Sequence, residues 1–140
     1  MMMKKLLISL ILVDQVVRNL IRFLFGFDQE IYTMGDWFTL MYFKNRSALA
    51  TEIVIIGMVI ISLIIIYKLL WNVKKIPLFV PFFIAGVVCN MLDGMVFGYV
   101  VDYIRFFKSP IFNLADIYIA IGFILMGKAI YGSAVHTAGR

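Results

Sequence analysis

Long apolar runs constrain this chain more than any other feature of its sequence. Four stretches, at about residues 6–25, 53–70, 76–94 and 111–131, consist mainly of Leu, Ile, Val, Phe and Met. A helix needs roughly 20 apolar residues to cross the hydrocarbon core of a bilayer. Of the 140 residues, 64% are hydrophobic and 15% are charged, whereas soluble domains average about 45–50% and about 25%. A single membrane domain therefore accounts for residues 1–140.

Basic residues flank these runs and predict how the chain is oriented, because short cytoplasmic loops carry an excess of Lys and Arg. One side of the membrane would hold seven of them: Lys4, Lys5, Lys68, Lys74, Lys75, Lys128 and Arg140. The other side would hold five: Arg22, Lys44, Arg46, Arg105 and Lys108. The bias places both termini in the cytoplasm. Since the basic residues do not form one stripe with interleaved aromatics, we expect no nucleic-acid partner.

These spans predict an all-α membrane protein, an antiparallel bundle of four transmembrane helices. The third span could extend from about residue 76 as far as Tyr103. Between the first two spans, residues 37–43 are rich in aromatics and short enough to form a strand. Aromatic rings favour the membrane interface. We therefore expect a small extracytoplasmic β-element in the loop between helices one and two.

Ionisable residues inside membrane spans are costly, so each needs a partner or a function. In the predicted spans or at their ends, the ones that matter for a site are Asp14, Arg18, Asp93, Asp102 and Asp116. Asp14 and Arg18 are four residues apart and can form an ion pair on one face of a helix. This pair is as compatible with fixing the first helix against its neighbours as with direct work in catalysis.

Asp102 and Asp116 lie on either side of a loop that contains Pro110. If the third and fourth helices are antiparallel neighbours, the two carboxyl groups lie at the same depth, near the outer surface. Two carboxyls held close together cannot both ionise cheaply, so they share a proton. Aspartic peptidases use this arrangement: one carboxylate takes a proton from water and the other polarises the scissile carbonyl. Spacing alone, however, is more often a sign of helix caps or loop contacts.

Five segments carry a resemblance that is far more specific than this spacing. They are Val13-Asp14-Gln15-Val16-Val17-Arg18, Asn45-Arg46-Ser47-Ala48, Gly86-Val87-Val88-Cys89-Asn90-Met91-Leu92-Asp93, Phe97-Gly98-Tyr99-Val100-Val101-Asp102-Tyr103-Ile104 and Pro110-Ile111-Phe112-Asn113-Leu114-Ala115-Asp116. In order and spacing they resemble the motifs of the lipoprotein signal peptidases, also called signal peptidase II. The resemblance covers almost the whole chain.

The resemblance implies a membrane aspartic endopeptidase of the bacterial inner membrane whose site lies near the extracytoplasmic face. Its substrate would be a prolipoprotein, cut before a cysteine that carries diacylglycerol. The catalytic dyad would be Asp102 and Asp116, and which is base and which is acid stays open. Supporting residues would be Asp14, Asn45, Asn90, Asp93 and Asn113. We expect no metal or other cofactor, contact with membrane lipid, and a monomer.

Two positions depart from the family pattern. Ser47 replaces a glycine, and Gly94 replaces an arginine that would be a partner for Asp93. They leave open a non-cleaving relative that binds lipidated segments. A small transporter subunit is another class, but transporters place paired polar residues at the midplane and often contain repeats. Here the carboxyls are predicted near one surface and no repeat is visible.

Overall fold

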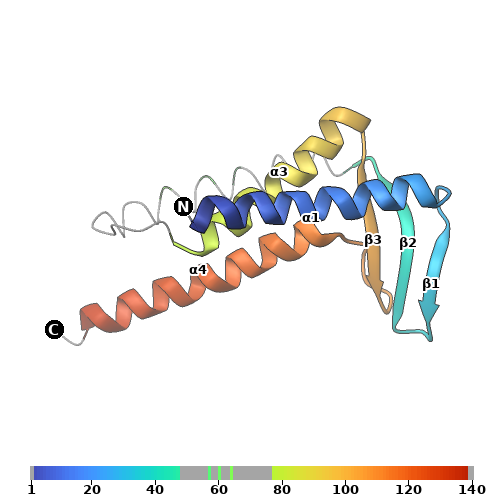
Figure 1. Ribbon diagram of the computed structural model, residues 1–140. Coiled ribbons are helices and arrows are strands. Elements are labelled where there is room, and N and C mark those ends of the chain that lie inside the picture. The colour runs from blue at the N-terminus through green and yellow to red at the C-terminus, as the bar shows by residue number, and fades with distance from the viewer. Residues whose placement is uncertain (1, 48–56, 58–59, 61–63, 65–76, 139–140) are drawn as a thin grey trace.

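The computed structural model describes residues 2–47, 57, 60, 64 and 77–138. In chain order its elements are α1 (Met2–Leu24), β1 (Glu30–Met34), β2 (Phe38–Asn45), α3 (Phe79–Phe97), β3 (Val100–Phe106) and α4 (Leu114–Ala138). The three helices extend in one direction from a small sheet that lies across their ends (Figure 1). Three of the four predicted spans are thus helical, with bounds shifted by a few residues. The predicted span 53–70 lies almost entirely outside the described residues.

The sheet has three antiparallel strands in the order β1-β2-β3. Strands β1 and β2 confirm the predicted β-element after the first helix. Strand β3 was not predicted, so the sheet is larger than the predicted β-element, and the possible extension of the third span to Tyr103 is wrong. Gly98 adopts the left-handed conformation (φ 73°), and its N–H donates to the carbonyl of Gly94 (3.0 Å). This glycine cap ends α3, and the chain then turns into β3.

The first helix is inside out by the standards of a soluble protein. Its buried residues are Asp14, Arg18 and Ile21, whereas large apolar side chains are exposed on other faces, among them Leu12, Val16, Leu20 and Phe23. A helix on the surface of a soluble protein shows the reverse pattern. Lipid as the outer solvent accounts for both observations, because it favours apolar side chains outside and forces charged ones to find partners inside.

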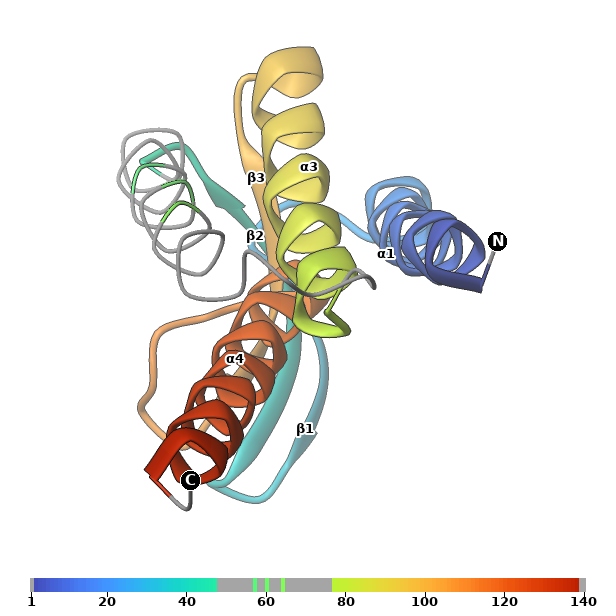
Figure 2. The same cartoon turned by 90° about the vertical axis from the view of Figure 1, so that its left-hand side faces the viewer.

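The other two helices are apolar on most of their surface. Phe79–Phe97 and Leu114–Gly132 are each long and apolar enough to span a bilayer. Viewed along the helices, α1 and α4 lie on different sides of α3 (Figure 2). The approach of α3 to α4 is close at Gly86, where a Cβ atom would lie 2.5 Å from the carbonyl oxygen of Ala115. Glycine at this position therefore lets the two backbones meet.

A hydrophobic cluster fixes the sheet to the end of the first helix. Ile21 of α1 packs with Tyr42 of β2 and with Val101 and Tyr103 of β3, and all four side chains are buried. Asp102 lies between the two β3 members of this cluster. The cluster therefore holds the strand that carries Asp102 against the helices.

Candidate active site

Asn113 connects the two aspartates that were predicted to form a pair. Asp102 lies within β3 and Asp116 in the first turn of α4. The Nδ2 atom of Asn113 donates to Oδ1 of Asp102 (2.6 Å), and its backbone N–H donates to Oδ2 of Asp116 (3.0 Å). In return, the backbone N–H of Asp116 donates to Oδ1 of Asn113 (3.1 Å). This reciprocal exchange is a capping box at the start of α4, and it fixes both carboxyls relative to one residue.

The loop between β3 and α4 returns to the strand before the helix begins. Phe112 forms an isolated bridge with Ile104, with backbone N–O distances of 2.9 Å and 2.8 Å in the two directions. The hydroxyl of Tyr103 accepts a hydrogen bond from the backbone N–H of Leu114 (3.2 Å). These contacts explain how residues on a strand and on a helix reach the same place. The predicted proximity of the two carboxyls arises from this bridge, and not from two antiparallel helices.

Asp102 is almost completely buried, with 3% of its surface exposed. Its second oxygen, Oδ2, accepts a hydrogen bond from Nδ2 of Asn45 (2.8 Å). Burial raises the pKa of Asp102 to about 6, the hydrogen bonds from Asn45 and Asn113 oppose the rise, and the negative charge of Asp116 adds to it. A carboxyl group of this kind exchanges its proton near neutral pH, as an acid–base catalyst must.

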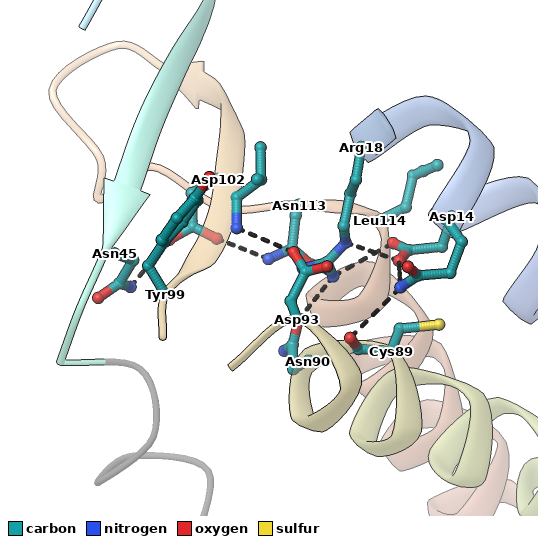
Figure 3. A network of polar contacts seen from close by, with 12 residues as sticks. Asp14, Arg18, Asn45, Cys89, Asn90, Asp93, Tyr99, Asp102, Asn113 and Leu114 are labelled. Atoms are coloured by element: carbon teal, nitrogen blue, oxygen red, sulfur yellow. Dashed lines mark hydrogen bonds and ion pairs between the residues drawn. The ribbon is translucent and has the colours of Figure 1, made fainter. Parts of the chain in front are cut away.

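Arg18 lies at the centre of the polar network and is fully buried (Figure 3). Its Nε donates to Asp14 (2.6 Å) and its Nη1 donates to Asp93 (2.9 Å). Its Nη2 donates to the Oδ1 atoms of Asn90 (2.6 Å) and Asn113 (3.0 Å). Two carboxylates and two amides thus surround one guanidinium, so the predicted pair of Asp14 and Arg18 is part of a larger cluster.

This arrangement determines which way the two asparagine side chains face. Because Arg18 can only donate, Asn90 and Asn113 both turn their oxygens toward it. Their Nδ2 groups then face the aspartates: Asn90 donates to Oδ1 of Asp116 (3.1 Å), and Asn113 donates to Asp102. Arg18 therefore acts on both aspartates through one amide each.

Asp93 has gained partners where the sequence suggested a loss. Beside Arg18, Arg22 forms an ion pair with it, with 2.5 Å between Nη2 and Oδ1, although the angles fall outside hydrogen-bond geometry. The guanidinium of Arg22 also lies over the ring of Phe97, 3.8 Å from its centroid. The backbone N–H of Val101 donates to Oδ2 of Asp93 (3.1 Å). Gly94 cannot supply the partner that an arginine would provide there, and α1 supplies two guanidinium groups to Asp93.

A comparison with protein families identifies the chain, because residues 6–131 match the model of signal peptidase (SPase) II. This chain belongs to the signal peptidase II family. It is 34% identical to the lipoprotein signal peptidase of Halothermothrix orenii over 124 residues, which cover 83% of this chain and 86% of that protein. It is 30% identical to the lipoprotein signal peptidase of Streptococcus thermophilus over 135 residues, 86% of each chain.

The fold of this signal peptidase II family member also matches solved structures. One bacterial membrane enzyme superposes with a TM-score of 0.69 at 22% identity and covers 92% of each chain. A second superposes with a TM-score of 0.72 at 20% identity and covers 95% of this chain and 89% of its own. At this level of identity the likeness concerns the fold alone.

All seven residues predicted for the site of this family member lie in one connected network. The network joins Asp14, Asn45, Asn90, Asp93, Asp102, Asn113 and Asp116 through direct hydrogen bonds or through Arg18. Sequence reasoning missed the central place of Arg18 and the role of Arg22. The signal was present, because Asp14, Arg18 and Arg22 recur every four residues on one face of α1.

We expect the double variant Asp14→Leu with Arg18→Leu to stay strongly destabilised. Replacing both members of an isolated buried ion pair can be nearly neutral. Removing one partner, which leaves a buried charge uncompensated, lowers the stability of the fold by about 3–5 kcal/mol. Here the double variant also removes the hydrogen bonds from Arg18 to Asn90 and Asn113 and leaves Asp93 with one guanidinium fewer. Thermal unfolding in detergent measures the effect.

The matched control is Glu30→Gln with Arg105→Gln, which removes an exposed ion pair of 3.2 Å between β1 and β3. Exposed pairs contribute about 0–1 kcal/mol, so this variant should unfold near the wild-type temperature. Recovery of wild-type stability in the Asp14→Leu, Arg18→Leu variant would instead mean that these two residues form an isolated pair.

Proposed function

We propose that this chain is an aspartic endopeptidase that removes the signal peptide from diacylglyceryl-modified bacterial prolipoproteins, cutting before the lipidated cysteine. Asp102 and Asp116 form the catalytic pair. The observation that carries the proposal is the attachment of both carboxyls to one residue, Asn113, at the junction of sheet and helices. Membership of the signal peptidase II family supports the choice of substrate.

The chemistry needs one ionised and one protonated carboxyl. The ionised member takes a proton from a water molecule, whose oxygen attacks the carbonyl carbon of the scissile bond. The protonated member donates a hydrogen bond to the carbonyl oxygen, where negative charge develops. When the tetrahedral intermediate collapses, the amine of the cysteine leaves with a proton from the pair. We do not divide the two roles between Asp102 and Asp116, because a coupled pair titrates as one unit.

The supporting residues act by position and charge. Asn45, Asn90 and Asn113 each donate a hydrogen bond to one of the two aspartates, which stabilises the ionised form against the cost of burial. Asp14 and Asp93 act through Arg18, whose charge they balance. None of these five residues needs to touch the substrate in this scheme, although Asn45 also lines the cavity beside Asp102.

For the membrane setting, we infer that both termini face the cytoplasm and that the sheet lies at the extracytoplasmic surface. The support is the seven-to-five bias of basic residues and the position of the sheet across one end of the helices (Figure 1). The site would then lie near the outer surface, within reach of a signal peptide held in the bilayer as an apolar helix. The enzyme acts as a monomer in this proposal.

Asp102→Asn and Asp116→Asn should each abolish cleavage, with a loss of at least about 100-fold in rate, because either change removes one member of the proton-sharing pair. The measurement is turnover of a purified diacylglyceryl prolipoprotein in detergent. Asp36→Asn, an exposed aspartate between β1 and β2, is the matched control and should leave turnover unchanged. Near wild-type turnover by either dyad variant would refute the assignment. Wild-type protein that binds this substrate without cutting it would favour a non-cleaving relative.

The rate should also depend on pH in a direction set by Asp102. Its pKa is raised to about 6, so the carboxyl becomes protonated as the pH falls below that value. The pair then has the one protonated and one ionised carboxyl that the chemistry needs, because the negative charge of Asp116 is what helps Asp102 to hold its proton. We therefore expect kcat/KM to fall by up to about tenfold per pH unit as the pH rises above about 6. Asn45→Ala removes a hydrogen bond that opposes the rise, so it should move this limb to higher pH. A profile that stays flat well above pH 6 would show that Asp102 is not part of the titrating pair.

Single cysteines report the orientation. In a Cys89→Ala background, Asp28→Cys should react with an impermeant thiol reagent from the extracytoplasmic side, and Asn72→Cys from the cytoplasmic side, as the basic bias predicts. Intact cells and lysed cells provide the comparison. Labelling of both positions from the same side would contradict the proposed topology.

A further inference from the structure

A cavity of about 920 Å³ opens beside Asp102, between the ends of β2 and β3 and the loop that follows β3. Its lining includes Asn45 and Asp102, and also three basic side chains, Arg46, Arg105 and Lys108. Cavities of roughly 300–1,000 Å³ with a few polar groups in fixed positions are typical ligand sites. Among the lining residues that the structure describes, Asp102 is the sole acidic one, so together they carry a net positive charge.

Two of the three cations have no ion-pair partner among the residues that the structure describes. Arg105 pairs with Glu30 (3.2 Å) and is about one-third exposed. Neither Arg46 nor Lys108 forms an ion pair with any other residue that the structure describes. Both are exposed. Their charges are therefore available to an anionic group that enters the cavity.

The backbone holds both cations in place. Lys108 follows Phe107, which has a left-handed backbone (φ 50°) and whose N–H donates to the carbonyl of Trp37 (2.8 Å). Ser109 closes the same turn, since its N–H donates to the carbonyl of Phe106 (2.9 Å). A non-glycine residue in this conformation is strained and persists where surrounding contacts enforce it. This turn is thus an ordered support for Lys108.

Arg46 is held between two residues that are themselves tied to the candidate dyad. The hydroxyl of Ser47 donates to Oδ1 of Asn45 (2.9 Å), and Nδ2 of Asn45 donates to Asp102 (2.8 Å). The backbone at Arg46 therefore has a fixed position relative to Asp102, one of the two proposed catalytic residues.

The position of the cavity indicates which side of the cut it serves. It lies against the sheet, and the sheet lies across the ends of the helices (Figure 1). An apolar signal peptide belongs beside the apolar helix faces, in lipid. The residues after the lipidated cysteine leave the membrane, so they pass along the sheet. Phe43, Phe107 and Ile111 give this part of the lining an apolar surface as well.

We propose that this cavity binds the first residues of the mature lipoprotein, and that Arg46 and Lys108 select substrates with acidic side chains there. The proposal rests on the proposed function, since it extends the same site beyond the scissile bond. A lipid phosphate has the same charge as such a side chain. The peptide is favoured because Asp102 is part of the lining, so the occupant is continuous with the bond that is cut.

The test uses three diacylglyceryl prolipoprotein peptides that differ in the two residues after the cysteine: Glu-Glu, Gln-Gln or Lys-Lys. With wild-type enzyme in zwitterionic detergent, we expect kcat/KM for Glu-Glu to exceed that for Gln-Gln by about fivefold, as exposed ion pairs allow, and Lys-Lys to be the slowest. Arg46→Gln with Lys108→Gln should bring the three values together. Arg46→Glu with Lys108→Glu should invert their order.

The ratio of substrates within each variant is the readout, so a general loss of activity does not affect it. The control Lys4→Gln with Lys128→Gln removes two positive charges, as Arg46→Gln with Lys108→Gln does, but far from the sheet. It should keep the wild-type order of the three peptides. If wild type cleaves all three peptides equally well, the cavity proposal is wrong and the proposed function stands. If it cleaves none, the proposed function fails and this proposal with it. A rate that depends through Arg46 and Lys108 on anionic lipid, and not on the peptide, identifies a lipid phosphate as the occupant and overturns the proposal.

Discussion

A guanidinium group buried among membrane helices must find an acceptor for every hydrogen it can donate, because water cannot replace a missing one. All three nitrogens of Arg18 donate hydrogen bonds, and the acceptors are Asp14, Asp93, Asn90 and Asn113. Removing one carboxylate would leave uncompensated charge at a cost of several kcal/mol. The acceptors come from α1, from α3 and from the residue that starts α4. One side chain thus couples the packing of three helices to the positions of two asparagines.

Lipid as the outer solvent explains why polar contacts have this importance. In water, burial of apolar surface would drive the helices together. In a bilayer, lipid chains are as apolar as Leu, so close packing and interhelical hydrogen bonds have to provide the association. Interhelical hydrogen bonds come from the polar face of α1, which has Asp14 and Arg18 inside and Leu12 and Val16 outside. Close packing occurs at Gly86, where α3 meets α4.

Much of this could be predicted from the sequence, and the exceptions have physical reasons. Apolar length predicted the helices, and motif spacing predicted which residues meet. Strand β3 was missed because apolar residues continue past the end of α3, although Gly98 is a typical helix terminator and Val100 and Tyr103 favour strands. The four-residue spacing places Arg22 on the same face of α1 as Arg18, but its pairing with Asp93 depends on how far α1 and α3 are shifted along each other, which the sequence does not give.

The same hydrogen-bond pattern occurs at Asn45, Asn90 and Asn113, and it gives Ser47 a role. Each amide oxygen accepts a hydrogen bond, from Arg18 for Asn90 and Asn113 and from Ser47 for Asn45. An amide whose oxygen is occupied in this way presents its NH₂ group in the opposite direction, and in each case that group meets Asp102 or Asp116. A glycine at position 47 has no hydroxyl to do this. Ser47 therefore adds an orienting contact, and the donors together limit how far burial raises the pKa of Asp102.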